Sequence, residues 1–524
     1  MKKITSFYEK HKWLCIAAGM SLLPLICCIL YCAVHGYAIA DVYLPADEWN
    51  DELFYFKQVE SILHYGYPRG YFGFNESHAM KLSFAAWSPV LVFPWIVWGF
   101  LFGWNLLSPV LCNIVLMMAA VFFFVWLARP EKRQLCTLSV LFVLFTPFTR
   151  YMLSGMPECS CFALLIVFYG LAYSWIYRQE SRTKLVLMIL LSALMTLMRP
   201  YLGLFLLLPL ALWIWKSRSL KSVLGSIAVL EITVGCYAAL NYYFSAEYFE
   251  PLFYTDWVTN FFEKGFLPGC KYVFGTLYYE GRAFFARVVE GFRSGLAEGA
   301  FFAVYCAAAI LFLIQAVRAF RHKDRKRLLL SGHMFFSYVA MLAALLLMYN
   351  MKDGSKHLLT FIAAGIFLIS LMKEKGIAYY RKAAVLGALF CYLLIFRADS
   401  SYDYEIPFIR EDAKEEMQYW EDRFTQEMKL KEGKPSYDNV IIWVFSDRLE
   451  ATGEQKLGEW QILYGIPEGF GISCCYADYT VEHFETLKSK YLLAVPDGKI
   501  EELCKQAGYL SIGRTENAVV YKRY

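Results

Sequence analysis

Charged residues are scarce in this sequence. Asp, Glu, Lys and Arg make up 19% of its 524 residues, whereas soluble domains carry about 25%. Apolar residues make up 58%, and they fall in runs of about 20 that basic clusters interrupt, the pattern of helices that cross a hydrocarbon layer about 30 Å thick. The composition therefore excludes soluble, fibrous and disordered proteins and predicts an α-helical polytopic membrane protein.

Several motifs that carry chemistry are also missing. None of the 15 Cys residues forms a CxxC pair, so the thiols predict neither a zinc site nor a disulfide framework. The sequence has no GxGxxG, GxxxxGK[ST], HExxH or GxSxG motif, which removes support for nucleotide cofactors and for the common hydrolases. The net charge of +5 is spread over many loops, so we expect no extended basic face and no nucleic-acid partner.

Lysine and arginine predict how the apolar segments are oriented. The segments lie at 13–34, 87–103, 106–128, 135–153, 159–177, 185–198, 201–215, 223–244, 300–317, 328–349, 358–372 and 383–396. Six basic clusters lie at 2–12, 129–133, 178–184, 216–221, 318–327 and 373–382. By the positive-inside rule these clusters share the cytoplasmic side, which requires that one segment does not cross.

The segment at 87–103 is the best candidate for one that does not cross, because it is short and opens with Trp87-Ser88-Pro89. We predict an interfacial or re-entrant helix there. About eleven spans remain, with the N-terminus cytoplasmic and the C-terminus outside. The first span reads as an uncleaved anchor, although Ala38-Ile39-Ala40 fits a cleavage site and keeps its removal open as an alternative.

Three larger pieces and three tight turns are thus expected outside. The pieces are 35–86, 245–299 and everything after 396, and the turns are 150–158, 199–200 and 350–357. In the tail, helix-like and strand-like patterns alternate, which predicts a small extracytoplasmic α/β domain. We divide the chain into a membrane domain, 1–396, and an α/β domain, 397–524.

The first external piece is rich in acid. Asp41, Asp47, Glu48, Asp51 and Glu52 place five carboxylates in twelve residues. An apolar stripe at helical spacing follows them, so we expect an amphipathic helix lying in the membrane interface, with the last two acids in its first turn. The carboxylates either serve chemistry or only cap this helix and suit its dipole.

Asp51-Glu52-Leu53-Phe54-Tyr55 matches a DE-x-x-Y pattern, and Gly66 follows at the end of the same helix. In this motif and in the order of spans and loops, the chain resembles the GT-C superfamily of membrane glycosyltransferases, notably the lipid-linked aminoarabinose transferases and the protein O-mannosyltransferases. It departs from them in the second acidic pair, Asp47-Glu48, and in having one proline, Pro89, where those families show two.

The resemblance implies a multi-pass enzyme of the cell envelope, of the inverting kind, that moves a sugar from a polyprenyl-phosphate donor to a glycan, lipid or protein acceptor on the outer face. It implies Asp51 as the general base, with Asp47 in reserve and Glu52 beside it. Other residues from the external segments are candidates for substrate binding: Glu48, Tyr55, Glu76, His78, Arg150, Glu158, Arg199, Lys352, Lys356 and His357.

Each candidate also has a plainer interpretation. A cation at the end of a span often snorkels to the interface, Glu158 could be only a helix N-terminal charge, and His78 could be an ordinary surface residue. A divalent metal ion is left open by the resemblance. A transporter or flippase of lipid-linked glycans and a non-catalytic membrane scaffold are the alternative functions. Convergence of the first-loop acids and the external basic turns on one place would favour the enzyme.

Overall fold

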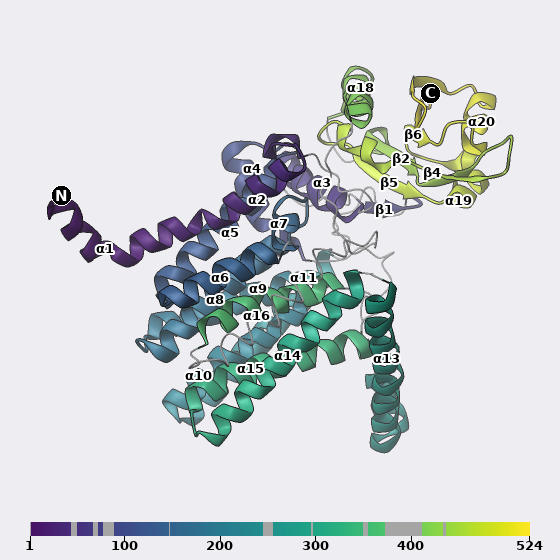
Figure 1. Cartoon of the computed structure of the whole chain (residues 1–524). Coiled ribbons are helices and arrows are strands. Elements are labelled where there is room, and N and C mark those ends of the chain that lie inside the picture. The colour runs from purple at the N-terminus through teal and green to yellow at the C-terminus, as the bar shows by residue number, and fades with distance from the viewer. Residues whose placement is uncertain are drawn as a thin grey trace.

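The structure is a computed structural model of the whole chain (Figure 1). It describes residues 2–42, 50–66, 72–76, 88–145, 147–244, 255–294, 297–348, 355–372, 411–432 and 436–524. The described residues form mostly helices. A small domain of strands and short helices follows at the C-terminal end of the chain.

The membrane domain consists of α-helices and three 3₁₀ turns. In chain order they are α1 (Lys2–Ser21), α2 (Leu23–Val34), η1 (Ile39–Asp41), α3 (Asn50–Tyr65), η2 (Pro89–Val92), α4 (Phe93–Phe102), α5 (Ser108–Ala128), α6 (Lys132–Leu144), α7 (Pro147–Met152), α8 (Glu158–Tyr177), α9 (Arg182–Met198), η3 (Pro200–Leu206), α10 (Leu207–Ser217), α11 (Leu220–Phe244), α12 (Asp256–Lys264), α13 (Phe266–Ser294), α14 (Ala297–Arg321), α15 (Arg325–Met348) and α16 (Ser355–Leu371).

Seven helices of the described part are long and apolar enough to cross a membrane, which confirms a multi-pass membrane protein. They are His11–Val34, Ser108–Ala128, Glu158–Tyr177, Pro200–Ser217, Leu220–Phe244, Phe302–Arg321 and Arg325–Met348. Of the other predicted spans, 135–153 is divided between α6 and α7, α9 and α16 have 17 residues each, and 383–396 lies outside the described residues. The count of eleven spans stays a prediction.

The segment predicted not to cross is indeed short. It forms the 3₁₀ turn η2 and then α4, with prolines near both starts. The apolar helix Pro89–Phe102 falls below the length of a span. It stops at Gly103, whose φ of +83° is a conformation that glycine adopts without steric cost.

Helix α8 is the centre of the membrane domain, and most of its side chains are buried. It packs against α5, α9 and α16. At Gly170 the backbone of α5 comes so close that an added Cβ would lie 3.1 Å from Phe124 Cα. This distance is tighter than most Cβ contacts, so a small residue at this position favours the close packing of α5 and α8.

The external piece predicted at 245–299 contains helices in its described part. Helix α12 packs on α13, and α13 packs on α14 and α15. Phe274, Tyr278 and Phe285 of α13 are exposed in the protein alone. Aromatic side chains of this kind are typical of helices that lie at a membrane surface.

The C-terminal domain is built around a six-stranded sheet in the order β1-β5-β2-β6-β8-β7. The strands are β2 (Val440–Val444), β5 (Gly471–Cys475), β6 (Tyr491–Ala494), β7 (Leu510–Arg514), β8 (Val519–Lys522) and, from the first external piece, β1 (Phe72–Phe74). Strands β3 (Ser446–Arg448) and β4 (Gln455–Leu457) form a separate pair, and the helices are α18 (Glu411–Glu427), α19 (Ala477–Glu482) and α20 (Lys499–Gln506).

Strand β1 joins the two parts of the chain, because it pairs in parallel with β5, Phe72 opposite Ile472. Figure 1 shows the sheet at the end of the helix bundle where α3 lies. The predicted division at residue 396 therefore omits a strand that the membrane domain contributes to the sheet.

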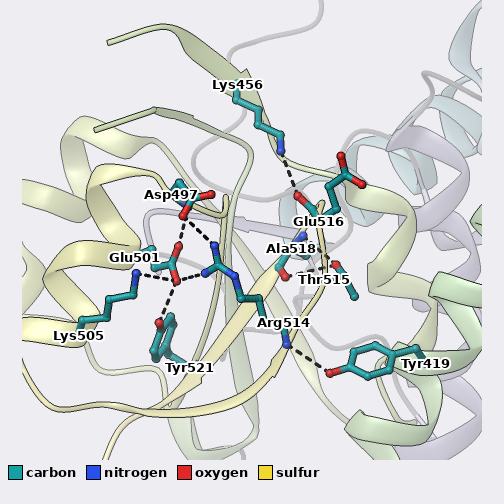
Figure 2. A network of polar contacts seen from close by, with 10 residues as sticks. All are labelled: Tyr419, Lys456, Asp497, Glu501, Lys505, Arg514, Thr515, Glu516, Ala518 and Tyr521. Atoms are coloured by element: carbon teal, nitrogen blue, oxygen red, sulfur yellow. Dashed lines mark hydrogen bonds and ion pairs between the residues drawn. The ribbon is translucent and has the colours of Figure 1, made fainter. Parts of the chain in front are cut away.

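A polar network holds helix α20 against the sheet (Figure 2). Arg514 of β7 lies between Asp497 and Glu501 and is paired with both. Tyr521 donates a hydrogen bond of 3.1 Å to the same buried Glu501. These contacts satisfy a buried carboxylate, so we interpret this network as structural.

Candidate functional site

The first turn of α3 carries the two acids of the DE-x-x-Y pattern. Glu52 is fully buried, and the backbone N–H of Gly155 donates a 2.8 Å hydrogen bond to its Oε1. Asp51 remains partly exposed. Acids are favoured in the first turn of a helix, so the helix dipole alone explains why Asp51 and Glu52 occur there. It does not explain why Glu52 is buried against a turn from another part of the chain.

The turn that meets Glu52 is fixed by a buried asparagine of α5. Asn113 Nδ2 donates to the carbonyl oxygen of Ser154 at 3.0 Å, and Asn113 Oδ1 accepts from Trp95 Nε1 at 3.0 Å. These contacts tie α4 and α5 to the residues between α7 and α8. The N–H of Gly155 is thereby held in place for Glu52.

A buried ion pair lies on the next helices. Arg199 Nη2 pairs with Glu158 Oε1, and both side chains are almost completely excluded from solvent. Glu158 begins α8. Arg199 directly follows the last residue of α9, Met198, and is extended because the next residue, Pro200, disfavours a helical residue before it. Two buried charges are costly unless they are paired. Arg199 therefore does not snorkel to the interface, and Glu158 is more than a charge at the start of a helix.

Aromatic and imidazole groups surround the pair. Tyr201, Tyr55 and Tyr237 lie close enough to Arg199 to interact with it electrostatically. His357 at the start of α16 is buried, and its Nδ1 lies 3.1 Å from the hydroxyl oxygen of Tyr201. Glu158 is thus paired with Arg199 and His357 contacts Tyr201, and Tyr201 lies within electrostatic range of Arg199.

Asp51 and Tyr55 are four residues apart on α3, so their side chains share one face of the helix. Tyr55 on that face lies within electrostatic range of Arg199, and Glu52 beside it binds the turn that precedes Glu158. Residues from the first external piece and from the three predicted external turns thus meet in one cluster. We name Asp51, Glu52, Tyr55, Glu158, Arg199, Tyr201 and His357 the carboxylate–arginine cluster.

The remaining candidates lie elsewhere or cannot be placed. Glu76 contacts the C-terminal domain: its carboxylate accepts from the N–H of Ser489 at 2.7 Å and from that of Lys488 at 3.1 Å. Arg150 is buried on α7. Asp47, Glu48, His78 and Lys352 and the side chain of Lys356 lie outside the described residues.

The C-terminal domain packs on α3, the helix that carries Asp51 and Glu52, through a loop between β4 and β5. Lys57 of α3 is fully buried, and its Nζ donates to the carbonyl oxygen of Ile466 at 2.7 Å and to Glu60 at 2.8 Å. Tyr65 donates to the carbonyl oxygen of Gly469 at 2.6 Å. Burial raises the pKa of Glu60, and the charge of Lys57 opposes that rise.

Tyr464 of the same loop reaches toward the cluster. Its ring packs on Phe56, and its hydroxyl is buried without a hydrogen-bond partner in the described part of the chain. Burial and the nearby Glu52 both raise the pKa of this phenol, so it stays protonated and able to donate.

Sequence reasoning missed Tyr201, Tyr464 and Asn113. Tyr201 directly follows the predicted external turn Arg199-Pro200, which was the available signal. Asn113 lies inside an apolar run, where a polar side chain is unexpected unless it has a role. Tyr464 carries no local signal, because its position follows from how the C-terminal domain packs on α3.

No group of three or more His, Cys, Asp or Glu side chains that could hold a metal ion occurs among the residues that the structure describes. The unplaced acids Asp47 and Glu48 are outside that search.

The chain matches no protein-family model and no curated protein. In structure it is similar to the oligosaccharyltransferase of Archaeoglobus fulgidus tethered with an acceptor peptide, with a TM-score of 0.46 and 12% identity over 94% of this chain and 70% of that one. It is also similar to ArnT from Cupriavidus metallidurans bound to undecaprenyl phosphate, with a TM-score of 0.43 and 10% identity over 98% of both chains. Similarities this distant leave the function to be inferred from the site.

Replacing Lys57 tests the contact between the C-terminal domain and α3. Lys57→Met removes the donor to Ile466, so we expect a loss of about 1 to 3 kcal/mol in the stability of this contact. The measurement is thermal unfolding in detergent together with the rate of proteolysis of the C-terminal domain. Lys429→Met, which changes an exposed lysine of that domain, is the control and should behave as the wild type. Equal proteolysis of all three proteins would show that Lys57 does not hold the domain.

Proposed function

We propose that the protein is a membrane glycosyltransferase that transfers a sugar from a polyprenyl-phosphate donor to an acceptor beside α3. The carboxylate–arginine cluster is the observation that carries the proposal. It combines a partly exposed carboxylate with buried groups that fix its helix, at the end of the bundle that the C-terminal domain covers. A scaffold needs no such cluster, and a transporter would place its polar groups near the middle of the membrane.

In the proposed reaction Asp51 is the general base. Its carboxylate takes the proton of the acceptor hydroxyl, whose oxygen forms a bond to the anomeric carbon of the sugar. The bond from that carbon to the donor phosphate breaks, and the phosphate leaves with the electron pair. Attack on the face opposite the leaving group inverts the anomeric carbon. A positioned base of this kind contributes about 10² to 10⁴ in rate.

The cluster supports this step by holding the base in place. Glu52 binds the N–H of Gly155 and thereby fixes the first turn of α3, so we assign it a positioning role. Arg199 and His357 add donors near the face that carries Asp51, where a departing phosphate gains from cationic and hydrogen-bonding groups. Arg150, Lys352 and Lys356 remain candidates for the same role. A divalent metal ion stays a prediction of the resemblance.

The activity is tested by incubating the purified full chain with a panel of polyprenyl-phosphate sugars and acceptors and measuring release of the lipid phosphate. We expect release from at least one donor, with no dependence on an added nucleotide. The same assay with EDTA tests the metal ion. Transport of the intact lipid-linked sugar without release would favour the flippase, and neither transport nor release with any donor would favour the scaffold.

The proposed orientation puts the cluster and the C-terminal domain outside the cell membrane and the N-terminus inside. Single cysteines at exposed positions of a variant without reactive thiols test it. We expect Arg133→Cys to be labelled only after the membrane is permeabilised, and Thr452→Cys to be labelled in intact cells by an impermeant maleimide, since both positions are exposed. External labelling at both positions would contradict the eleven-span topology.

A further inference from the structure

A second polar site lies at the opposite ends of the helices that form the carboxylate–arginine cluster. Helix α8 begins at Glu158 in the cluster and ends at Tyr177, and α16 begins beside His357 and ends at Leu371. A cavity of about 180 Å³ lies between these far ends and the start of α15. A helix of 20 residues is about 30 Å long, so this cavity is separate from the proposed active site by about the thickness of a membrane.

The lining of the cavity divides into an apolar wall and a polar mouth. Leu330, Leu368 and Leu371 are buried in the wall, whereas Tyr177 and Asp324 are exposed at the mouth. This arrangement suits a ligand with an apolar body and a polar head.

A buried hydroxyl in the lining points to a ligand that accepts a hydrogen bond. Ser331 is fully buried, and its Oγ has no hydrogen-bond partner in the described part of the chain. Hydroxyls buried in helices usually bind a carbonyl oxygen one turn earlier or another polar group. Arg327, one turn before Ser331 on α15, lines the same cavity and supplies a positive charge, and its Nη2 donates to the buried Gln315 of α14, which holds the guanidinium in place.

The ends of the two helices next to Arg327 are rich in basic residues. Arg318 and Arg321 lie in the last turn of α14, Lys323 lies in the loop, and Arg325 and Lys326 lie in the first turn of α15. The one acid there, Asp324, is engaged in capping, because its Oδ1 accepts the N–H of Arg327 at 3.1 Å. Basic pockets between helices at a membrane surface bind anionic lipid head groups.

The geometry points to a binding site for the head group of an anionic phospholipid, with its phosphate at Arg327 and Ser331 and its head-group hydroxyls beside Tyr177. The cavity of about 180 Å³ is too small for whole acyl chains, so only the first part of a chain lies against the leucine wall and the rest stays in the bilayer. The site is independent of the proposed glycosyl transfer. It is the end of the molecule that the basic clusters predict to be cytoplasmic, the side on which anionic lipids attract basic segments.

The test is a titration of delipidated, detergent-purified full chain with phosphatidylglycerol and with phosphatidylcholine, followed by native mass spectrometry. We expect phosphatidylglycerol to bind about tenfold more tightly than phosphatidylcholine, and Arg327→Gln to remove most of that difference because one cationic contact to the phosphate is lost. Ser331→Leu, which fills the cavity, should lower binding of both lipids. Lys326→Gln changes an exposed neighbour that does not line the cavity and should bind as the wild type.

Several outcomes would overturn the assignment. Equal affinity for the two lipids, or unchanged phosphatidylglycerol binding by Arg327→Gln, would exclude the phosphate contact. Displacement of phosphatidylglycerol by inorganic phosphate at similar concentration would identify a site for free phosphate. Stronger, Arg327-dependent binding of polyprenyl phosphate than of phosphatidylglycerol would identify a donor-lipid site. If Ser331→Leu does not fold, Arg327→Gln decides, because this partly exposed arginine can be changed without filling the interior.

Discussion

Asp51→Asn should leave the protein folded and lower the rate of sugar transfer by about 10² to 10⁴. Asparagine keeps the size of the side chain and part of its hydrogen bonding, but it cannot accept the proton of the acceptor hydroxyl. If Asp51 only stabilises the N-terminus of α3, the same change costs about 1 kcal/mol of stability and leaves the rate unchanged. Initial rates of lipid-phosphate release and thermal unfolding of the same preparations separate the two roles.

Two neighbouring acids provide controls for Asp51. Asp47→Asn should reduce the rate less, because Asp47 precedes the helix that aims Asp51. Glu52→Gln should lower both the stability of the protein and the rate of sugar transfer, because the carboxylate of Glu52 binds the N–H of Gly155 inside the protein. Loss of activity in Asp47→Asn with full activity in Asp51→Asn would move the base to the earlier pair. Full activity of both variants would end the case for carboxylate catalysis in this loop.

The elements that the sequence predicted best are those with a complete local signal. The apolar run Val440–Val444, one of the strand-like patterns of the tail, forms β2, and all five of its side chains are buried. A strand buried on both faces reads as a continuous apolar run, so it can be recognised without its neighbours. The helix that starts at Asp51-Glu52 was likewise predictable from its acidic first turn and its apolar stripe.

The elements that the sequence could not predict depend on distant partners. Strand β1 has three residues, one of them Gly73, and its neighbour β5 comes from the C-terminal domain. Glu76, a candidate for substrate binding from its place in the loop, owes its contacts to Lys488 and Ser489 on that same domain. Pairing across such a separation leaves no periodic pattern in either segment.

The carboxylate–arginine cluster shows the same division. Residues Glu158 and Arg199 were each predicted to lie at an external turn, because the positive-inside rule places their segments there. Their pairing was not predicted, since they are 41 residues apart and lie on different helices. Topology brings candidate residues to one end of the bundle, whereas side-chain packing decides which of them meet.

Breaking the buried ion pair should have the largest effect on stability. Arg199→Met leaves the carboxylate of Glu158 buried without its counter-charge, which costs about 3 to 5 kcal/mol when a buried pair loses one partner. Arg182→Met, at the exposed start of the same helix α9, is the matched control and should change stability by no more than about 0.5 kcal/mol. Thermal unfolding in detergent measures both.

The double variant Glu158→Gln/Arg199→Met separates the pair's effect on folding from its effect on the reaction. Removing both charges eliminates the uncompensated charge, so we expect most of the lost stability to return. If Arg199 also helps the phosphate to leave, the stable double variant will stay impaired in donor turnover, because the positive charge near Tyr55 is gone. Recovery of both stability and turnover would mean that the pair only holds α8 and α9 together, and that the cation for the leaving phosphate must come from another external turn.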